Sequence, residues 1–402
     1  MLAFLAVAGP GLIAANAGND AGGILTYASA GAQFAYRTLF LMLLVTVALV
    51  VVQEMCSRLG AYTGKGLGAL IREQFSVRSS TGAMALLFIA NVGLTVSEFA
   101  GIGAAMELLG VSRYIAVPLA LAGIWAVTVF GTYSKAERAS LALSLAFVAY
   151  PIAAILAHPD WAVVTRDLVT PHFVRSSAFL VLAVALIGTT ITPYMQFYVA
   201  SAVVDKKIGP DQYPAERVDT VNGAIVSNVV SIFIIIATAA AIGGTGPLSS
   251  ASEAAKALEP VVGSLAPTLF GVGLLGASLL AALVVPLSSS YAIAEAFGVE
   301  RSVSDRPRQA PLFFGLFTAQ LVVGAAIALA PGNLVSLAVN MQVLNGLITP
   351  VLLTFVLILA NRRSVLGNAA NGRVFKTVAT ICVSAVAILA VTVVGLKAFG
   401  AG

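Results

Sequence analysis

The sequence has few charged residues, and this scarcity excludes most classes of soluble protein. Asp, Glu, Lys and Arg make up 10% of the 402 residues, whereas a soluble domain has about 25% charged residues. Hydrophobic residues make up 59%. So few charges cannot cover a water-exposed surface, and this hydrophobicity also excludes intrinsic disorder. We therefore interpret the chain as a polytopic membrane protein.

Cysteine and histidine are nearly absent, with two residues of each. Cys56 and Cys382 stand far apart in or beside apolar runs, without the spacing of a metal site or a disulfide framework, and we interpret them as buried thiols. His158 and His172 each adjoin a proline in one short polar connection, which does not favour a metal site. No nucleophile–base pair or metal triad is present, so we expect neither enzymatic activity nor a bound cofactor.

Long apolar runs make up most of the chain. The hydrocarbon core of a bilayer is about 30 Å thick and requires about 20 apolar residues per helix. With that window the sequence predicts an all-α protein with eleven membrane-spanning helices in a single transport domain, 1–402, and a short interfacial helix within 249–264. The predicted spans are 3–30, 38–57, 82–110, 114–133, 139–158, 177–204, 221–243, 266–297, 311–330, 334–360 and 374–399.

The Lys and Arg residues indicate the orientation of the chain. Basic residues concentrate in the cytoplasmic connections of membrane proteins. With a cytoplasmic N-terminus, most of the 22 Lys and Arg residues fall in such connections, including 57–81 and 205–220. We therefore expect a multi-pass protein of the cell membrane with its C-terminus outside, and the net charge of +5 requires no nucleic-acid partner. The residues expected outside are Arg37, Arg113, Arg166, Arg175, Lys256 and Lys397.

Two predicted spans contain residues that interrupt a helix at membrane depth. In the first span the interruption is 17–23 (AGNDAGG), and in the sixth it is 188–193 (GTTITP), where Pro193 has no N–H to donate. Unwound backbone is tolerated in a membrane only where it is buried in protein or lines a cavity. A simple kink would explain one such interruption. Two in matching positions of two halves indicate the binding site of a transporter.

Asp20 and Glu98 are the acidic residues that lie well inside apolar spans. A charge at mid-bilayer costs about 2.5–3.5 kcal/mol on insertion scales, so such a residue indicates a function. No Lys or Arg stands mid-span to pair with either carboxylate, and an unpaired aspartate beside unwound backbone favours a cation as substrate. An anionic substrate would favour a free helix N-terminus instead. Asp20 has one alternative role, which is to cap the half-helix that follows it.

Three segments give the chain a specific resemblance. Gly9-Pro10-Gly11 precedes the first interruption, 30–37 reads AGAQFAYR, and 58–67 reads RLGAYTGKGL. In this order and spacing they resemble the Nramp family of divalent metal transporters over nearly the full length of the chain. The resemblance implies a LeuT-like fold with broken helices 1 and 6. Its inverted five-helix repeats would lie at about 1–158 and 176–360, with an extra helix at about 374–399.

The resemblance also implies a set of metal ligands, which this chain keeps only in part. The first-helix motif of the family is Asp-Pro-Gly-Asn. Here Asp20 keeps the acid, Gly23 stands in place of the asparagine, and Asn19 is a neighbouring substitute acting through water. The sixth-helix motif is Ala-x-x-Met-Pro-His, in which the alanine carbonyl and the methionine sulfur contact the ion. Thr189 and Thr192 stand at those two positions here.

Further matches concern the tenth helix and the movement of protons. Gln342 matches a glutamine that joins the metal site in some states of the family. Tyr194 replaces the histidine of the sixth helix, and Thr95 with Glu98 replaces the Asp-x-x-Glu of the third. Fewer ionisable groups remain to relay protons. We therefore expect weak or no proton coupling, with Thr95, Glu98 and Tyr194 as candidates for a proton pathway or gate.

The replacement of methionine by Thr192 affects the choice of ion. Soft thioether ligands select softer transition metals, whereas hydroxyl, carboxylate and water oxygens suit hard ions. Mg²⁺ keeps several waters, so a wide, oxygen-lined site suits it. The pattern resembles the divergent Nramp-related magnesium transporters, and we expect Mg²⁺ as substrate with Mn²⁺ also accepted and no obligate protein partner. The alternatives are a proton-coupled Mn²⁺ or Fe²⁺ importer and an amino-acid or organic-cation transporter on the same fold.

Overall fold

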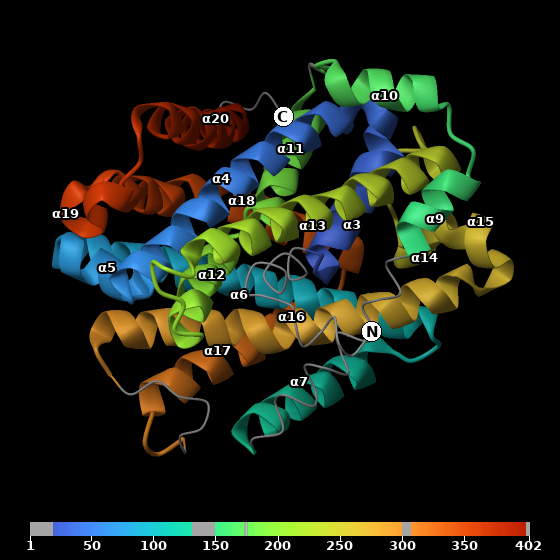
Figure 1. Ribbon diagram of the computed structural model, residues 1–402. Helices are drawn as coiled ribbons and strands as arrows, with labels where there is room; N and C mark the ends of the chain where they lie inside the picture. The colour runs from blue at the N-terminus through green and yellow to red at the C-terminus, as the bar shows by residue number, and fades with distance from the viewer. Residues whose placement is uncertain (1–18, 131–148, 173, 175, 300–306, 399–402) are drawn as a thin grey trace.

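The apolar runs fold into long helices that pack side by side in the computed structural model (Figure 1). The structure describes residues 19–130, 149–172, 174, 176–299 and 307–398, and every regular element in these ranges is helical. The long helices are α3 (Ala21–Phe34), α4 (Leu39–Thr63), α6 (Val77–Leu108), α7 (Arg113–Val129), α11 (Ser177–Thr190), α12 (Pro193–Asp205), α13 (Tyr213–Ile242), α16 (Ala266–Phe297), α17 (Pro311–Ala328), α18 (Leu334–Asn361) and α20 (Arg373–Ala398). The short elements are η1 (Ala35–Thr38), α5 (Leu67–Gln74), α9 (Ala149–Leu156), α10 (Trp161–Val169), α14 (Ala251–Ala255), η3 (Lys256–Leu258), α15 (Glu259–Val262), η4 (Gly263–Leu265), α19 (Arg363–Leu366) and η5 (Gly367–Ala369).

The predicted spans that fall within the described residues coincide with helices, and eight segments there are long and apolar enough to cross a membrane. The start of the span at 3–30, most of the span at 139–158 and the Gly9-Pro10-Gly11 segment lie outside the described residues. The predicted interfacial stretch contains α14, η3, α15 and η4. The amphipathic helix α10 is absent from the sequence prediction; Asp160 caps it by accepting from the N–H of Ala162 at 2.9 Å.

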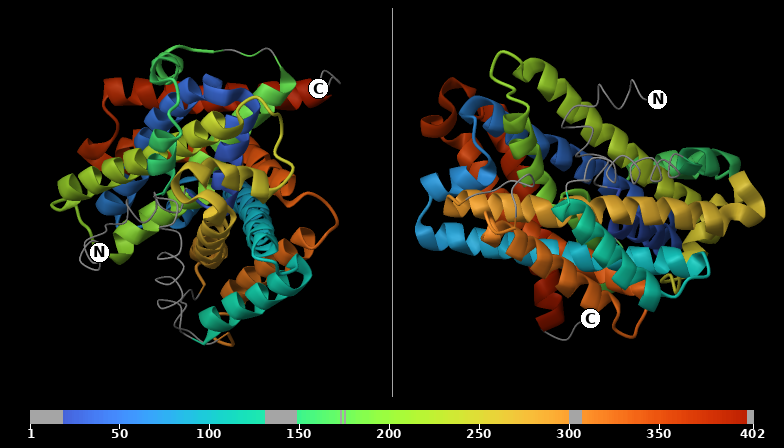
Figure 2. Two further views of the ribbon diagram at one scale, coloured as in Figure 1. Left: turned by 90° about the vertical axis from the view of Figure 1, so that its right-hand side faces the viewer. Right: turned by 90° about the horizontal axis from the view of Figure 1, so that it is seen from below.

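Helix α6 lies at the centre of the packing. It contacts α16, α18 and α17 along its length, and α7 as well. Helices α7 and α17 lie beside each other on one flank of the bundle, below α16 in Figure 1, and two further views show the same arrangement (Figure 2). On the other side of the core, α13 packs against both α3 and α4. Residues in the middle of α6 therefore lie at the centre of the molecule, beside the start of α3.

Two glycines bring α11 and α18 into backbone contact. A Cβ on Gly188 would overlap the carbonyl oxygen of Gln342, and a Cβ on Gly346 would overlap the carbonyl oxygen of Val184. Small residues allow such close approach between membrane helices. The contact places Thr189, next to Gly188, beside the turn of α18 that carries Gln342.

The sequence predicts an interruption at 188–193 of the sixth helix, and the structure has a shorter break at Ile191 and Thr192, between α11 and α12, because residues 188–190 stay helical. Thr190 ends α11, Ile191 has φ −112° and ψ 52°, and Pro193 begins α12. Proline suits the first position of a helix because its fixed φ is helical and no N–H is lost there.

The predicted interruption at 17–23 is helical from Ala21 onward, and residues 17 and 18 lie outside the described part of the chain. Asp20 is extended, but Ala21, Gly22 and Gly23 already form the first turn of α3. The three small residues do not break the helix because Asp20 caps it, so the prediction of unwound backbone through residue 23 is wrong.

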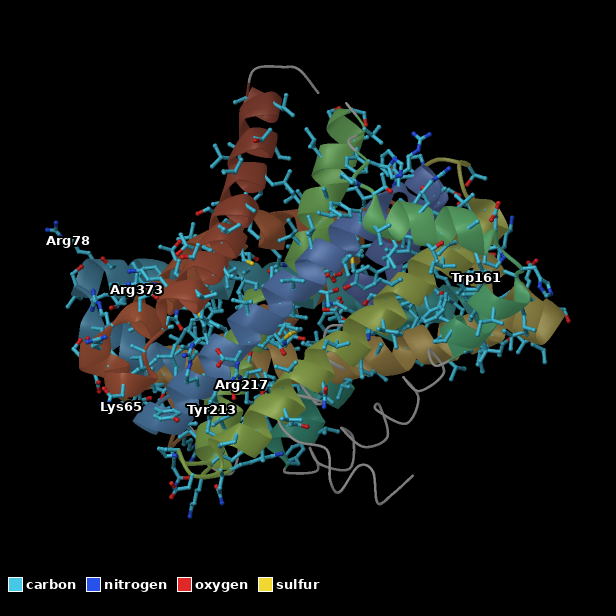
Figure 3. The ribbon with its side chains drawn as sticks, turned by 45° about the horizontal axis from the view of Figure 1, so that its top comes forward. Lys65, Arg78, Trp161, Tyr213, Arg217 and Arg373 are labelled. Atoms are coloured by element: carbon cyan, nitrogen blue, oxygen red, sulfur yellow. The ribbon has the colours of Figure 1, made fainter. Side chains whose placement is uncertain are left out.

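The two ends of the bundle differ in the side chains they present. Lys65, Arg78, Arg217 and Arg373 gather at one end, and Trp161 lies at the opposite end (Figure 3). The basic end includes connections that the sequence assigns to the cytoplasm.

A candidate metal-ion site at the start of α3

Asp20 stands at the start of α3 with one carboxylate oxygen engaged and one without a protein partner. Its side chain is 1% exposed, and Oδ1 accepts from the backbone N–H of Gly23 at 2.6 Å. The positive end of the helix dipole stabilises a carboxylate in this position. Oδ2 has no hydrogen-bond partner. Asp20 therefore caps α3 and retains an oxygen for a ligand, which combines the two roles considered from the sequence. Gly23 contributes through its backbone, by fixing that carboxylate.

Glu98 of α6 approaches the same helix start from the other side. Its Oε2 accepts from the N–H of Ala21 at 3.2 Å, Oε1 has no partner, and the side chain is fully buried. Asp20 and Glu98 lie close enough to interact electrostatically. The structure thus brings into the site a residue that the sequence assigned to a proton pathway. Ser97, beside Glu98, is also buried with a hydroxyl that has no partner, and the sequence reasoning missed it.

Gln342 of α18 lies against the backbone of Gly22. A Cβ at Gly22 would overlap Nε2 of Gln342 and Oγ of Ser97, so both polar groups press on the first turn of α3. The amide of Gln342 is fully buried, and neither its oxygen nor its nitrogen has a partner. The structure therefore places Gln342 against the first turn of α3, beside Ser97.

The break between α11 and α12 supplies two threonines. Thr189 and Thr192 are fully buried, and neither hydroxyl has a hydrogen-bond partner. Thr192 is the residue before α12 but its side chain makes no capping bond. Both hydroxyls therefore keep their lone pairs free for a ligand.

The other two proton-pathway candidates are placed differently from Glu98. The hydroxyl of Thr95 donates to the carbonyl of Asn91 in its own helix at 2.7 Å, and its methyl group faces Gly324 of α17. Tyr194 is fully buried in an apolar cluster with Leu94, Ala281 and Val285. Thr95 thus faces α17, and the Tyr194 ring packs between α6 and α16.

Asn19 points its amide toward α13. Its Nδ2 donates to Oγ of Ser227 at 3.2 Å, and its Oδ1 accepts from the hydroxyl of Ser231 at 3.1 Å. Nearby, the hydroxyls of Tyr27 and Thr190 are 3.0 Å apart. Asn19 therefore borders the site, with both ends of its amide held by another helix.

Four residues around the start of α3 and two threonines at the sixth-helix break carry buried polar atoms without a hydrogen-bond partner. A buried polar group without a hydrogen bond costs about 1–3 kcal/mol, so each such atom requires an explanation. A cation explains this group because nearly all of its members are oxygens with free lone pairs. The described residues contain no group of three or more His, Cys, Asp and Glu that could hold a metal ion, so a cation here would depend on hydroxyl and amide oxygens beside the two carboxylates. The members are Asp20 Oδ2, Ser97 Oγ, Glu98 Oε1, Thr189 Oγ1, Thr192 Oγ1 and both amide atoms of Gln342.

A cavity of about 290 Å³ opens near one side of the site. Its lining includes Ala104 of α6, Glu107, Arg113 and Asn333. Ala104 is one helical turn from Gly101, where an added Cβ would overlap the side chain of Ala21. The cavity therefore ends about one turn of α6 from the residue that follows Asp20. Packed side chains close the site itself, because Asp20 is only 1% exposed.

A bundle of long apolar helices with a buried polar site beside a broken helix has the architecture of a secondary transporter. Residues 11–395 match the family described as natural resistance-associated macrophage protein-like, and the chain belongs to this Nramp family.

Curated relatives share this family. The divalent metal cation transporter MntH of Ralstonia nicotianae is 29% identical over 396 residues, covering 93% of this chain and 87% of the relative. The divalent metal cation transporter MntH 1 of Pseudomonas aeruginosa is 30% identical over 287 residues, covering 67% and 64%. Both names describe transporters of divalent metal cations rather than enzymes.

Solved structures support the predicted LeuT-like fold. The Eremococcus coleocola manganese transporter superposes with a TM-score of 0.75 at 20% identity, covering 96% of this chain and 85% of that one. The amino-acid-bound transporter MhsT gives a TM-score of 0.55 at 13% identity, covering 96% and 97%. At these identities the likeness concerns the fold alone, and it confirms the fold class expected from the sequence.

Proposed function

We propose that this protein carries divalent metal ions across the cell membrane by alternating access around Asp20. Its membership of the Nramp family and the names of its curated relatives support this proposal. The donor set adds independent support. Two buried carboxylates, from Asp20 and Glu98, lie among hydroxyl and amide oxygens, which suit a cation rather than an anion.

Within this proposal the preferred ion is Mg²⁺, with Mn²⁺ also accepted. One observation carries the choice: Thr192 offers a buried hydroxyl where the family has a methionine sulfur. Met195, one turn further along α12, does not restore that ligand because its Sδ accepts from Gln53 of α4 at 2.8 Å. A site of oxygens alone suits a hard ion that keeps part of its water.

Proton coupling is weak or absent in the same proposal. Thr95 bonds to its own helix, and the ring of Tyr194 packs in an apolar cluster within electrostatic range of Asp20 and Glu98, so these two carboxylates are the acidic groups of the site. Metal uptake into liposomes that hold a pH dye should proceed without matching acidification. Acidification in proportion to uptake would favour the alternative, a proton-coupled Mn²⁺ importer, which the manganese transporters among the structural relatives support.

We also propose that the domain, 1–402, has inverted repeats at about 1–158 and 176–360, with the N-terminus in the cytoplasm. The end of the bundle that carries Lys65, Arg78, Arg217 and Arg373 would then face the cytoplasm (Figure 3). Labelling of single cysteines placed at Arg78 and at Trp161 in whole cells tests this orientation. We expect an impermeant reagent to label the Trp161 position only, and labelling at Arg78 instead would reverse the topology.

Uptake into proteoliposomes that contain a Mg²⁺- or Mn²⁺-sensitive dye tests the transport function. Asp20→Asn removes the charge but keeps the size of the side chain, and uptake should fall by about tenfold or more, the effect of ~1.4 kcal/mol. Asp211→Asn is the matched control, since Asp211 is exposed in the connection before α13. Wild-type flux in Asp20→Asn would refute the site. Accumulation of an amino acid or organic cation in place of metal would refute the substrate class.

A further inference from the structure

Asn19 and two serines of α13 form a neutral polar surface on one side of Asp20. Ser227 and Ser231 are one turn apart on α13 and hold the two ends of the Asn19 amide, at 3.2 and 3.1 Å. Ser227 and Ser231 are 8% and 1% exposed, so this surface lies within the protein. Mid-membrane hydroxyls on α13 would otherwise be expected to bond only to their own helix, as Ser231 also does to Ser227.

The break in the sixth helix extends this surface. The hydroxyls of Tyr27 and Thr190 are 3.0 Å apart, and Tyr27 lies near Ser231 and Thr189. The hydroxyl of Thr189 is fully buried and has no hydrogen-bond partner. A buried, unpartnered hydroxyl that faces a cluster of other oxygens indicates a missing polar ligand.

The chemistry of the cluster determines what that ligand is. Its oxygens are all uncharged, and the Asn19 oxygen already accepts a hydrogen bond, so the cluster is a weak direct site for a divalent ion. Hydroxyls and amides both donate and accept, which suits water. Groups one layer outside the direct ligands orient those ligands and tune the affinity for the metal. Mg²⁺ retains several waters and therefore requires such partners.

We propose that Asn19, Tyr27, Thr190, Ser227 and Ser231 form a water-binding face that holds the water ligands of a hydrated divalent ion beside Asp20. This inference rests on the proposed transport of divalent ions and names the residues that select an ion by its retained water. An ion that sheds water readily depends little on this face. An ion that keeps its water depends on it strongly.

The alternative reading is mechanical: the serines only clamp the chain at Asn19. A clamp and a water-binding face differ in what a mutation changes. Loss of a clamp lowers stability and weakens the binding of every ion alike. Loss of the water-binding face changes the ratio of affinities between ions. The test therefore measures the ratio of Mg²⁺ affinity to Mn²⁺ affinity on folded protein.

Two substitutions of equal size at Ser231 separate the contribution of the hydroxyl from that of volume. Ser231→Val and Ser231→Thr have nearly the same shape, but only Thr keeps the hydroxyl. We expect Ser231→Val to weaken Mg²⁺ binding by about three- to tenfold relative to Mn²⁺, the effect of one lost hydrogen bond. Ser231→Thr should stay near the wild-type ratio. Calorimetric titration of the purified full-length protein with each ion gives the affinities.

Ser290→Ala is the control for loss of a buried hydroxyl elsewhere. Ser290 is fully buried in α16 and donates to the carbonyl of Pro286 in its own helix at 2.7 Å, so its removal should leave the ion ratio unchanged. An unchanged ratio in Ser231→Val overturns the inference, and so does an equal shift in Ser231→Thr. If Ser231→Val does not fold, Ser227→Ala serves in its place with the same expected direction.

Two further results separate this inference from the proposed function. Ser231→Val and Ser231→Thr could show the same Mg²⁺-to-Mn²⁺ affinity ratio while Asp20→Asn still abolishes uptake. In that case the proposal of a water-binding face is wrong and the transport site remains. If Mg²⁺ binding requires Na⁺ or K⁺ in the wild type but not in Ser231→Val, the cluster holds a monovalent cation instead of water, and the inference is wrong.

Discussion

Replacing Thr192 by methionine is the most direct test of ion selectivity. Thr192 is fully buried, its hydroxyl has no partner, and it makes no capping bond to α12. The substitution therefore breaks no side-chain hydrogen bond. The local backbone contact, in which Nε2 of Gln196 donates to the Thr192 carbonyl at 3.4 Å, does not involve the side chain that is changed.

Two effects act in the same direction on the ratio of affinities. The thioether is a favourable ligand for Cd²⁺ or Mn²⁺ and an unfavourable one for hydrated Mg²⁺. The larger side chain also displaces water that Mg²⁺ would retain. Overpacking a buried site costs about 1–3 kcal/mol, but that cost falls on the folded protein whichever ion is bound and largely cancels in the ratio. A shift of ~1.4 kcal/mol in relative binding is a tenfold change, and we expect a change of about that size.

The assay is competitive binding of Cd²⁺ and Mg²⁺ to purified protein whose folding is checked by thermal melting. Thr192→Leu is the matched control, because leucine and methionine are similar in volume but only methionine has sulfur. The Cd²⁺-to-Mg²⁺ ratio should rise in Thr192→Met well above its value in Thr192→Leu. If the ratio stays level or falls in folded Thr192→Met, Thr192 does not contact the ion, and the magnesium proposal loses its main support.

Three further substitutions, one with a matched control, test the packing and the charge around the site. Gly346→Ala should lower the free energy of unfolding by about 1–3 kcal/mol, since the new methyl group overlaps a carbonyl of α11; Gly315→Ala, in open space on α17, should change the melting temperature little. Gly22→Ala should displace the amide of Gln342 and weaken ion binding, and equal affinity in calorimetry would show that the amide is not a ligand. Glu98→Gln keeps an acceptor for the N–H of Ala21 but removes a charge, so divalent-ion affinity should fall while the melting temperature is largely kept.

The sequence predicted the helices and the sixth-helix break well because both follow from local properties. Apolar length determines a membrane span, and Pro193 cannot continue the hydrogen-bond ladder of α11. Residues 21–23 were wrongly predicted to be unwound because glycine content alone does not break a helix that has a cap. Asp20 provides that cap, and residues 21–23 are helical as a result.

Side-chain direction was harder to predict. Ser97 and Ser231 are hydroxyls in apolar helices, where serine commonly bonds to its own backbone, so nothing in the sequence distinguishes them from other serines. Their roles depend on which distant helix lies opposite: the start of α3 for Ser97, and Asn19 for Ser231. Thr95 illustrates the reverse case, because its position in the motif suggested a role but its hydroxyl bonds to Asn91. Tertiary packing determines which partner each of these hydroxyls meets.

The balance of charge around α3 accounts for the absence of basic residues from the site. Asp20 and Glu98 both bind the N-terminal turn of one short helix, and a helix end carries only about half a positive charge. Among the described buried residues Arg58 is the one cationic side chain, and it pairs with Glu54 at 3.1 Å. In the described part of the chain, therefore, no buried basic side chain is available to neutralise these two carboxylates. In the proposed function a divalent ion supplies that charge while it is bound, which would couple occupancy of the site to the stability of the closed arrangement around it.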